Sequence, residues 1–217
     1  MVIGAHPDDE ILGAGGTLAR HVKAGDEVHA IVVADGASSR APDDMMATLE
    51  TDATRAAKTI GFASIRLQSL PDQRLDTVPF IDLTQLLESE LADIRPHVVY
   101  THFPGDVNAD HGLVARAAWT ACRPYSRPQV RRFAVFETPS STEWAWPLND
   151  SSLQPNHFVD VSETLEIKIA AMECYKTELR DYPHPRSSRA LRERAAYWGS
   201  QVGRLAVEPF RILRDLE

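Results

Sequence analysis

Short apolar runs rich in β-branched residues alternate along the chain with longer stretches in which apolar residues recur at helical spacing. The short runs predict strands at residues 2–5, 28–34, 64–67, 97–102, 131–138 and 157–161. The longer stretches predict helices at residues 11–23, 45–60, 79–94, 112–122, 164–179 and 187–203. Strands that alternate with helices are typical of a parallel sheet with helices on both faces. The pattern therefore predicts a doubly wound α/β fold, in which the short strand 2–5 has the weakest support.

The size and charge of the chain narrow the class of protein. With 217 residues, 43% of them hydrophobic, the sequence predicts one well-buried domain over residues 1–217. A net charge of −8 without a block of Lys and Arg argues against nucleic acid as a partner. No apolar run approaches the length of a membrane span and no signal peptide is recognisable, so we predict a cytoplasmic protein. Composition does not decide between a monomer and a homo-oligomer.

Two other features indicate structure rather than chemistry. The distant Cys122 and Cys174 lie in helical patterns and predict free thiols, with neither a disulfide nor a Cys-ligated metal. Gly13, Gly15 and Gly16 lack the spacing of a phosphate-binding loop and lie within the predicted helix 11–23. We therefore interpret these glycines as positions where the helix packs closely on the sheet.

The most informative motif follows directly after the first strand. His6, Asp8, Asp9 and Glu10 place one imidazole and three carboxylates on a strand-to-helix connection, and open α/β sheets bind ligands at such carboxyl ends. His6 and Asp9 are three residues apart and can face one point, while Asp8 must point elsewhere. A catalytic zinc usually takes three protein ligands, so this segment lacks one. The alternative is that the acidic residues only stabilise a helix N-terminus.

A second segment repeats the same arrangement of strand, polar loop and helix. Residues 102–111 follow the apolar run at 98–100 and contain two histidines and two aspartates. Two such loops at the carboxyl ends of one sheet can converge on one ion, and His111 then supplies the third ligand. Asp110 is also a candidate N-cap of the helix that follows. For His102 we favour a supporting role over a ligand role, and we interpret His21, His29, His97 and His157 as structural or exposed.

These motifs resemble a known family. Residues 5–10 together with residues 108–111 look like the paired metal motifs of the PIG-L/LmbE-like family of zinc-dependent N-deacetylases, and weaker similarity extends over residues 70–75, 140–144 and 183–187. The resemblance implies a Rossmann-like fold and one Zn²⁺ bound by His6, Asp9 and His111, with Asp8 as the general base. It also implies a small-molecule or glycan substrate that carries an N-acetylglucosamine-type group, and acetate and a free amine as products.

The chain departs from the family pattern at one position. Many members have His where this sequence has Asn108, and Asn donates a hydrogen bond but carries no proton at neutral pH. We predict that His184, held between Pro183 and Pro185, takes over the acid role, with a plain surface turn as the alternative. Asn108 and Asp110 are then expected to bind substrate or support the ligands. Arg186 receives no specific role from the sequence.

Three functions remain open at this point. The leading one is removal of the acetyl group from an N-acetylated amino sugar. The second is a zinc amidohydrolase that acts on a non-sugar amide, and the third is a catalytically silent sugar-binding protein. A site with mixed nitrogen and oxygen ligands can also accept iron or cobalt, so the sequence does not decide for zinc.

Overall fold

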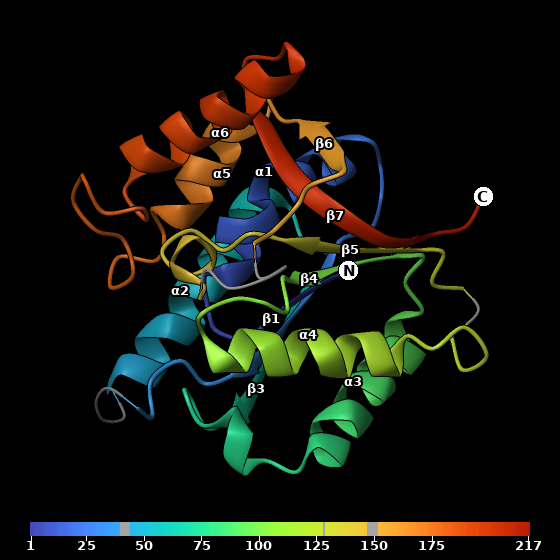
Figure 1. Cartoon of the computed structure of the whole chain (residues 1–217). Helices are drawn as coiled ribbons and strands as arrows, with labels where there is room; N and C mark the ends of the chain where they lie inside the picture. The colour runs from blue at the N-terminus through green and yellow to red at the C-terminus, as the bar shows by residue number, and fades with distance from the viewer. Residues whose placement is uncertain (40–43, 128, 147–151) are drawn as a thin grey trace.

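The computed structural model describes residues 1–39, 44–127, 129–146 and 152–217. In these residues seven strands form one sheet in the order β3-β2-β1-β4-β5-β7-β6 (Figure 1). The strands are β1 (Val2–Gly4), β2 (His29–Ala34), β3 (Ser64–Leu70), β4 (Val98–His102), β5 (Arg132–Phe136), β6 (His157–Asp160) and β7 (Val207–Asp215). The helices are α1 (Asp9–Lys23), α2 (Asp44–Ile60), α3 (Phe80–Ile94), α4 (Ala109–Ala121), α5 (Leu165–Met172) and α6 (Ser188–Val202), with short 3₁₀ turns η1 (Leu75–Thr77) and η2 (Thr142–Trp144).

Alternating side chains along the strands build a core on each face of the sheet. Val2 of β1 packs in the cluster that includes residues of α1, α2 and α5, whereas the next residue, Ile3, packs in the cluster with α3 and α4. Both side chains are fully buried. Figure 1 accordingly shows α3 and α4 on one side of the sheet and α1, α2, α5 and α6 on the other. The predicted α/β fold with a mostly parallel sheet is confirmed.

The strand order makes β1 and β4 neighbours in the sheet although they are far apart in the sequence. Strands β3, β2, β1, β4 and β5 are parallel, and the chain passes outward from β1 to β3 before it returns to β4 on the other side of β1. The carboxyl ends of β1 and β4 are therefore neighbours at a topological switch point, where open α/β sheets bind their ligands. The loops that follow these two strands carry the motifs of residues 6–10 and 102–111.

The structure differs from the predicted elements in the C-terminal part. The helix expected at 164–179 ends at Met172, because the chain then turns inward and buries Tyr175 completely. No element was expected after residue 203, yet β7 pairs antiparallel with both β5 and β6. Pro209 obscures this strand in the sequence, since proline usually argues against a strand. Both differences arise from tertiary contacts that local patterns do not contain.

The interpretation of the glycines as packing positions is confirmed at Gly13. A Cβ atom at this position of α1 would lie 2.1 Å from Cδ2 of Phe136 in β5, far inside van der Waals contact. At Gly16 a Cβ atom would lie 2.9 Å from Val161. Helix α1 therefore approaches the sheet so closely that these positions have no room for a side chain.

Two further expectations concern cysteines and membranes. Cys122 is buried, Cys174 is partly buried, and both are free thiols. Among the described residues, no helix combines the length and the apolar character that crossing a bilayer requires.

Candidate active site

Three predicted ligands meet above the ends of β1 and β4. Oδ2 of Asp9 lies 3.3 Å from Nδ1 of His6 and 3.4 Å from Nε2 of His111. One potential ligand atom from each of the three residues lies within 4.8 Å of the other two, and all three residues are buried. His6 and Asp9 come from the loop after β1 and the first turn of α1, and His111 comes from the first turn of α4. This arrangement of two nitrogens and one carboxylate oxygen can hold a metal ion.

Each histidine is backed by a carboxylate on the side away from Asp9. Nε2 of His6 lies 3.1 Å from Oδ2 of Asp110, and Nδ1 of His111 lies 3.3 Å from Oδ2 of Asp106. Carboxylates of this kind fix the orientation and the tautomer of metal-binding histidines and raise their basicity. The surroundings of both imidazoles therefore fit metal ligands better than they fit ordinary buried histidines.

The expectation that Asp110 caps α4 is wrong. The N-cap is Asn108, whose Oδ1 accepts a hydrogen bond of 2.9 Å from the backbone N–H of Asp110. The Asp110 carboxylate instead lies against His6 and accepts a hydrogen bond of 3.1 Å from the backbone N–H of Leu75. Asn caps a helix as well as Asp does, so the sequence alone could not assign the cap.

The metal-free cluster strongly perturbs the pKa values of its members. Burial alone would lower the pKa of His6, but hydrogen bonds to Asp110 and Asp9 outweigh it and raise the pKa to about 10. Burial likewise opposes the charged form of His111, but the charge of Asp9 and the contact with Asp106 raise its pKa to about 9. Burial raises the pKa of Asp9, whereas His111 and His102 hold it well below its usual range. Without metal, the imidazoles of His6 and His111 are therefore protonated on both ring nitrogens and positively charged at neutral pH.

Metal binding is consequently expected to release protons. Ligand histidines must be deprotonated, so Zn²⁺ should displace about two protons on binding near pH 7, and its affinity should fall as the pH is lowered. Calorimetric titration with Zn²⁺ in buffers of different ionisation enthalpy measures this number. A release close to zero would contradict the assignment of His6 and His111 as ligands.

Asp8 lies beside the cluster but contributes no ligand atom to it. It is 3% exposed and adopts a φ angle of 109°, a left-handed conformation that is rare for residues with a side chain. Burial and the neighbouring charge of Asp9 raise the pKa of Asp8 well above its usual range, which Arg186 partly offsets. The predicted separation between two ligands and one independent carboxylate agrees with this geometry.

His102 lies next to the cluster and contacts His111 and the backbone of Ala5. Its Nε2 accepts a hydrogen bond of 2.9 Å from the backbone N–H of Ala5, so the ring proton must be on Nδ1, which lies 3.0 Å from the hydroxyl oxygen of Thr138. Its ring stacks on His111 with a centroid distance of 3.9 Å. Burial lowers the pKa of His102 to about 4. This neutral, fully buried ring stacks on His111 and is not one of the three residues of the cluster.

A cavity of about 290 Å³ opens over the cluster and is lined by His6, Asp9 and His111 together with Asp8. Its other polar lining residues include Ser39, Asp72, Gln73, Asn108, Ser140, Ser141 and Arg186. Of the four described non-glycine residues with positive φ, three line this cavity, namely Asp8, Gln73 and Ser140. Strained backbone is typical of functional sites. The cluster of possible metal ligands, the cavity and the strained backbone therefore lie at the same place in the molecule.

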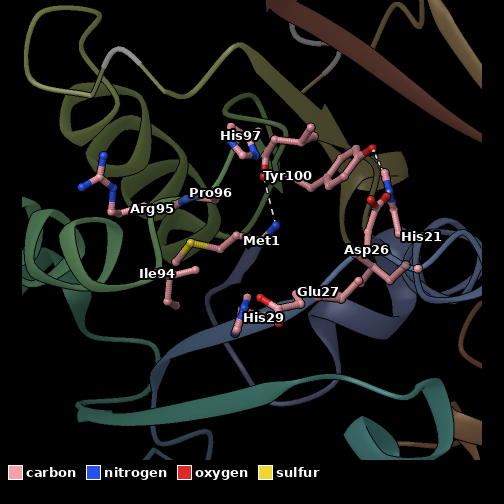
Figure 2. Close-up of a pocket in the computed structure, with 14 residues that line it drawn as sticks. Met1, His21, Asp26, Glu27, His29, Ile94, Arg95, Pro96, His97 and Tyr100 are labelled. Carbon is pink, nitrogen blue, oxygen red and sulfur yellow. Dashed lines mark hydrogen bonds and ion pairs between the residues drawn. The ribbon is translucent and has the colours of Figure 1, made fainter.

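A larger cavity of about 360 Å³ lies at the opposite edge of the sheet (Figure 2). Figure 2 shows His21 directed at the hydroxyl group of Tyr100 and the amine of Met1 at the backbone of β4, and the corresponding hydrogen bonds measure 2.9 and 3.0 Å. Nδ1 of His29, also in this cavity, lies 2.8 Å from the Ser64 hydroxyl. Within the described residues, the three-residue cluster that can hold a metal lies only at the other edge. The smaller cavity is therefore the candidate active site.

Comparison with known proteins agrees with this geometry. Residues 1–122, more than half of the chain, match the family described as PIG-L: GlcNAc-PI de-N-acetylase. The chain belongs to the PIG-L family. Membership makes it a hydrolase of the deacetylase class.

Two relatives and two solved structures illustrate the similarity. The uncharacterized deacetylase YaiS of Escherichia coli is 30% identical over 183 residues, which cover 82% of this chain and 90% of that protein. The 1D-myo-inositol 2-acetamido-2-deoxy-alpha-D-glucopyranoside deacetylase of a Mycobacterium species is 27% identical over 235 residues, covering 86% and 76%. The conserved protein TT1542 from Thermus thermophilus has a TM-score of 0.81 at 24% identity, covering 100% and 94%. The 4-carboxy-2-hydroxymuconate hydratase GalB from Pseudomonas putida has a TM-score of 0.76 at 19% identity, covering 100% and 96%. Since a hydratase shares the fold, the fold alone does not determine the reaction.

In this PIG-L family member, His184 and Arg186 occupy different positions relative to the cavity. His184 is partly buried and does not line it, and its Nδ1 accepts a hydrogen bond of 3.1 Å from the backbone N–H of Arg186. The His184 ring lies edge-on to Trp144 at a centroid distance of 6.4 Å. Arg186 does line the cavity and contacts Asp8. Sequence reasoning missed this contact, because nothing in a single chain connects residues 178 positions apart.

Proposed function

We propose that this protein is a zinc-dependent hydrolase that removes the acetyl group from an N-acetylated amino sugar. The observation that carries the proposal is the buried cluster of His6, Asp9 and His111 with Asp8 beside it on the wall of one cavity. Two imidazoles and one carboxylate are a usual ligand set of catalytic zinc, which keeps a further position open. The carboxylates behind both histidines support the same assignment.

The roles of the residues follow from their positions. When bound, Zn²⁺ would polarise the substrate carbonyl and lower the pKa of water from about 15.7 towards ~7. Asp8 accepts the proton of the water that attacks the acetamide carbon, so a C–O bond forms and the carbonyl oxygen becomes an oxyanion. Asp8 then returns this proton to the nitrogen as the C–N bond breaks, which leaves acetate and a free amine.

Asn108 is suited to stabilise the oxyanion. Its Oδ1 is occupied by the backbone N–H of Asp110, and its Nδ2 donates to Oε1 of Gln73 at 3.3 Å. An amide nitrogen has two N–H donors, so one remains for the substrate at the cavity wall. Asp110 acts behind His6 and keeps the ligand oriented.

The substrate class is proposed from the cavity and from the relatives. Hydroxyl and amide side chains, including Ser39, Gln73 and Ser140, line the cavity and suit the hydroxyl groups of a sugar. The mycobacterial relative is named as a deacetylase of an acetamido-glucopyranoside. We therefore expect a sugar that carries an acetamido group; a cytoplasmic location stays a prediction from the sequence.

The test is acetate release from a panel of N-acetylglucosamine derivatives and non-sugar N-acyl amines. Zinc-loaded protein should release acetate from at least one sugar, and protein treated with a chelator should not, with activity restored when Zn²⁺ is added back. Release from the N-acyl amines alone would favour the non-sugar amidohydrolase. Sugar binding without turnover by the zinc-loaded protein would favour a silent binding protein and contradict the proposal.

His184 is the second candidate for the proton that the amine receives. If it supplies that proton, the His184→Ala variant should show kcat lowered by about 10²-fold or more with its zinc content intact. If His184 instead influences only substrate binding and not the chemical step, the substitution should change KM and leave kcat unchanged. Steady-state kinetics of this variant thus assign proton return either to His184 or to Asp8 alone.

A further inference from the structure

The segment between α5 and α6, residues 173–187, holds the turn that carries Asp8. Arg186 donates from Nη1 to Oδ2 of Asp8 at 3.2 Å and to Oε2 of Glu178 at 2.9 Å. The hydroxyl group of Tyr175 donates to Oε1 of Glu10 at 2.5 Å, and Oε2 of Glu10 accepts the backbone N–H of Asp8 at 3.2 Å. The segment lies outside residues 1–122, to which the family match extends.

Asp8 needs such support for two reasons. Its backbone has a φ angle of 109°, so its conformation persists only if the surroundings impose it. The negative charge of Asp9 also acts against an ionised Asp8 carboxylate, because like charges repel. Among the described residues, Arg186 is the only one with a hydrogen bond to the Asp8 carboxylate. Removal of this donor would free the side chain to rotate.

The surroundings of Arg186 suit a residue that positions Asp8 better than a residue that binds an anionic substrate. Its single positive charge is already shared between two carboxylates, Asp8 and Glu178, both at most 3% exposed. An incoming anion would meet the carboxyl groups of Asp8 and Glu178, which already occupy Nη1 of Arg186. The Nε atom of Arg186 is also buried without a partner among the described residues, which is costly for a purely structural ion pair.

We propose that Arg186, held in place by Glu178, positions the Asp8 carboxylate for the chemical step. The inference rests on the proposed function, since it assumes that Asp8 is the general base. Arg186 acts through Asp8 and forms no bond with the reacting atoms. A displacement of a reacting group by about 1 Å can cost about 10²-fold in rate, so loss of this contact should appear in kcat.

The experiment compares Arg186→Met with Arg186→Lys. Arg189→Met is the control, because Arg189 lies three residues further along and contacts the exposed side chains of Glu193 and Tyr182. The Arg186→Met variant should show kcat lowered by about 10–10²-fold, with KM changed by less than about threefold. Its zinc affinity, measured by chelator competition, should stay unchanged because Arg186 touches no ligand. Arg186→Lys keeps the charge and should recover part of the rate, and added guanidinium should partly rescue Arg186→Met. The control should match the wild type.

Several results would overturn the inference, and three of them come from kinetics and stability. An increase of KM at constant kcat would make Arg186 a substrate-binding residue, and a lower Tm at unchanged kcat would make it a structural one. The third is an additional loss when Arg186→Met is introduced into the Asp8→Asn variant, because a residue that acts through Asp8 has no further effect once the base is absent.

Failure of the proposed function gives a different pattern. If Asp8→Asn itself retains turnover, the assignment of the base fails. If Asp8→Asn loses turnover while Arg186→Met does not, only the positioning role of Arg186 fails.

A crystal structure of Arg186→Met tests the inference without a substrate. The Asp8 carboxylate should have moved from its wild-type rotamer, and an unchanged rotamer would contradict the proposal. Should Arg186→Met not fold, the same kinetic and structural comparisons on Arg186→Lys decide.

Discussion

Replacement of Asp8 by Asn is expected to lower kcat by about 10²- to 10⁴-fold while the protein still binds Zn²⁺. The substitution preserves the shape of the side chain but removes the group that accepts the proton of the attacking water. His6, Asp9 and His111 remain unchanged, and the Asp8 carboxylate contributes no atom to their cluster. The measurement is acetate release at saturating substrate, together with the zinc content of the same preparation.

The control for this variant is Asp82→Asn. Asp82 is exposed in the first turn of α3 and, like Asp8, lies at the beginning of a helix, but it does not line the cavity. It should therefore retain full turnover. An Asp8→Asn variant with near wild-type kcat would remove Asp8 from the role of general base and would leave proton transfer to another group.

Replacement of His111 by Ala is expected to remove zinc binding and turnover together. This histidine provides one of only two nitrogens in the cluster, and its ring is fixed by Asp106 on one side and by His102 on its face. Loss of a supporting residue costs about 10–100-fold in metal affinity, so loss of a ligand should cost more. Chelator competition and metal analysis measure the affinity, and the acetate assay measures turnover.

His97→Ala is the matched control, because His97 is exposed at the opposite edge of the sheet. It should bind Zn²⁺ and turn over substrate like the wild type. The two experiments give a crossed pattern, in which Asp8→Asn binds metal without turnover and His111→Ala does neither. A His111→Ala variant that binds Zn²⁺ as tightly as the wild type would show that the ion binds elsewhere.

The parts of the molecule that short stretches of sequence encode were predictable. Strands β2 to β5 and the helices between them follow from apolar periodicity, because each pattern is complete within one element, whereas the short strand β1 had the weakest support. The loops of residues 6–10 and 102–111 follow from the same reasoning, since the carboxyl ends of parallel strands share one edge of the sheet. His6, Asp9 and His111 therefore converge as their spacing predicted.

Long-range contacts determined the parts that sequence reasoning missed or misplaced. Helix α5 ends at Met172 because Tyr175 turns inward to bond Glu10, a partner 165 positions away. Strand β7 contains Pro209 and exists because β5 and β6 offer edges on both of its sides. Likewise, Asn108 caps α4 because the Asp110 carboxylate is already engaged with His6.

The sequence by itself determined the α/β architecture, the family motifs and which residues can bind a metal, because these properties depend on residue type and short spacing. Only the tertiary structure decided how Asp8 is held, that His102 supports His111, and that Arg186 and not His184 lines the cavity. The physical reason is that burial, charge and hydrogen-bond geometry at a site depend on side chains brought together from distant segments. A single unfolded chain contains the residues of the site but not the distances between them.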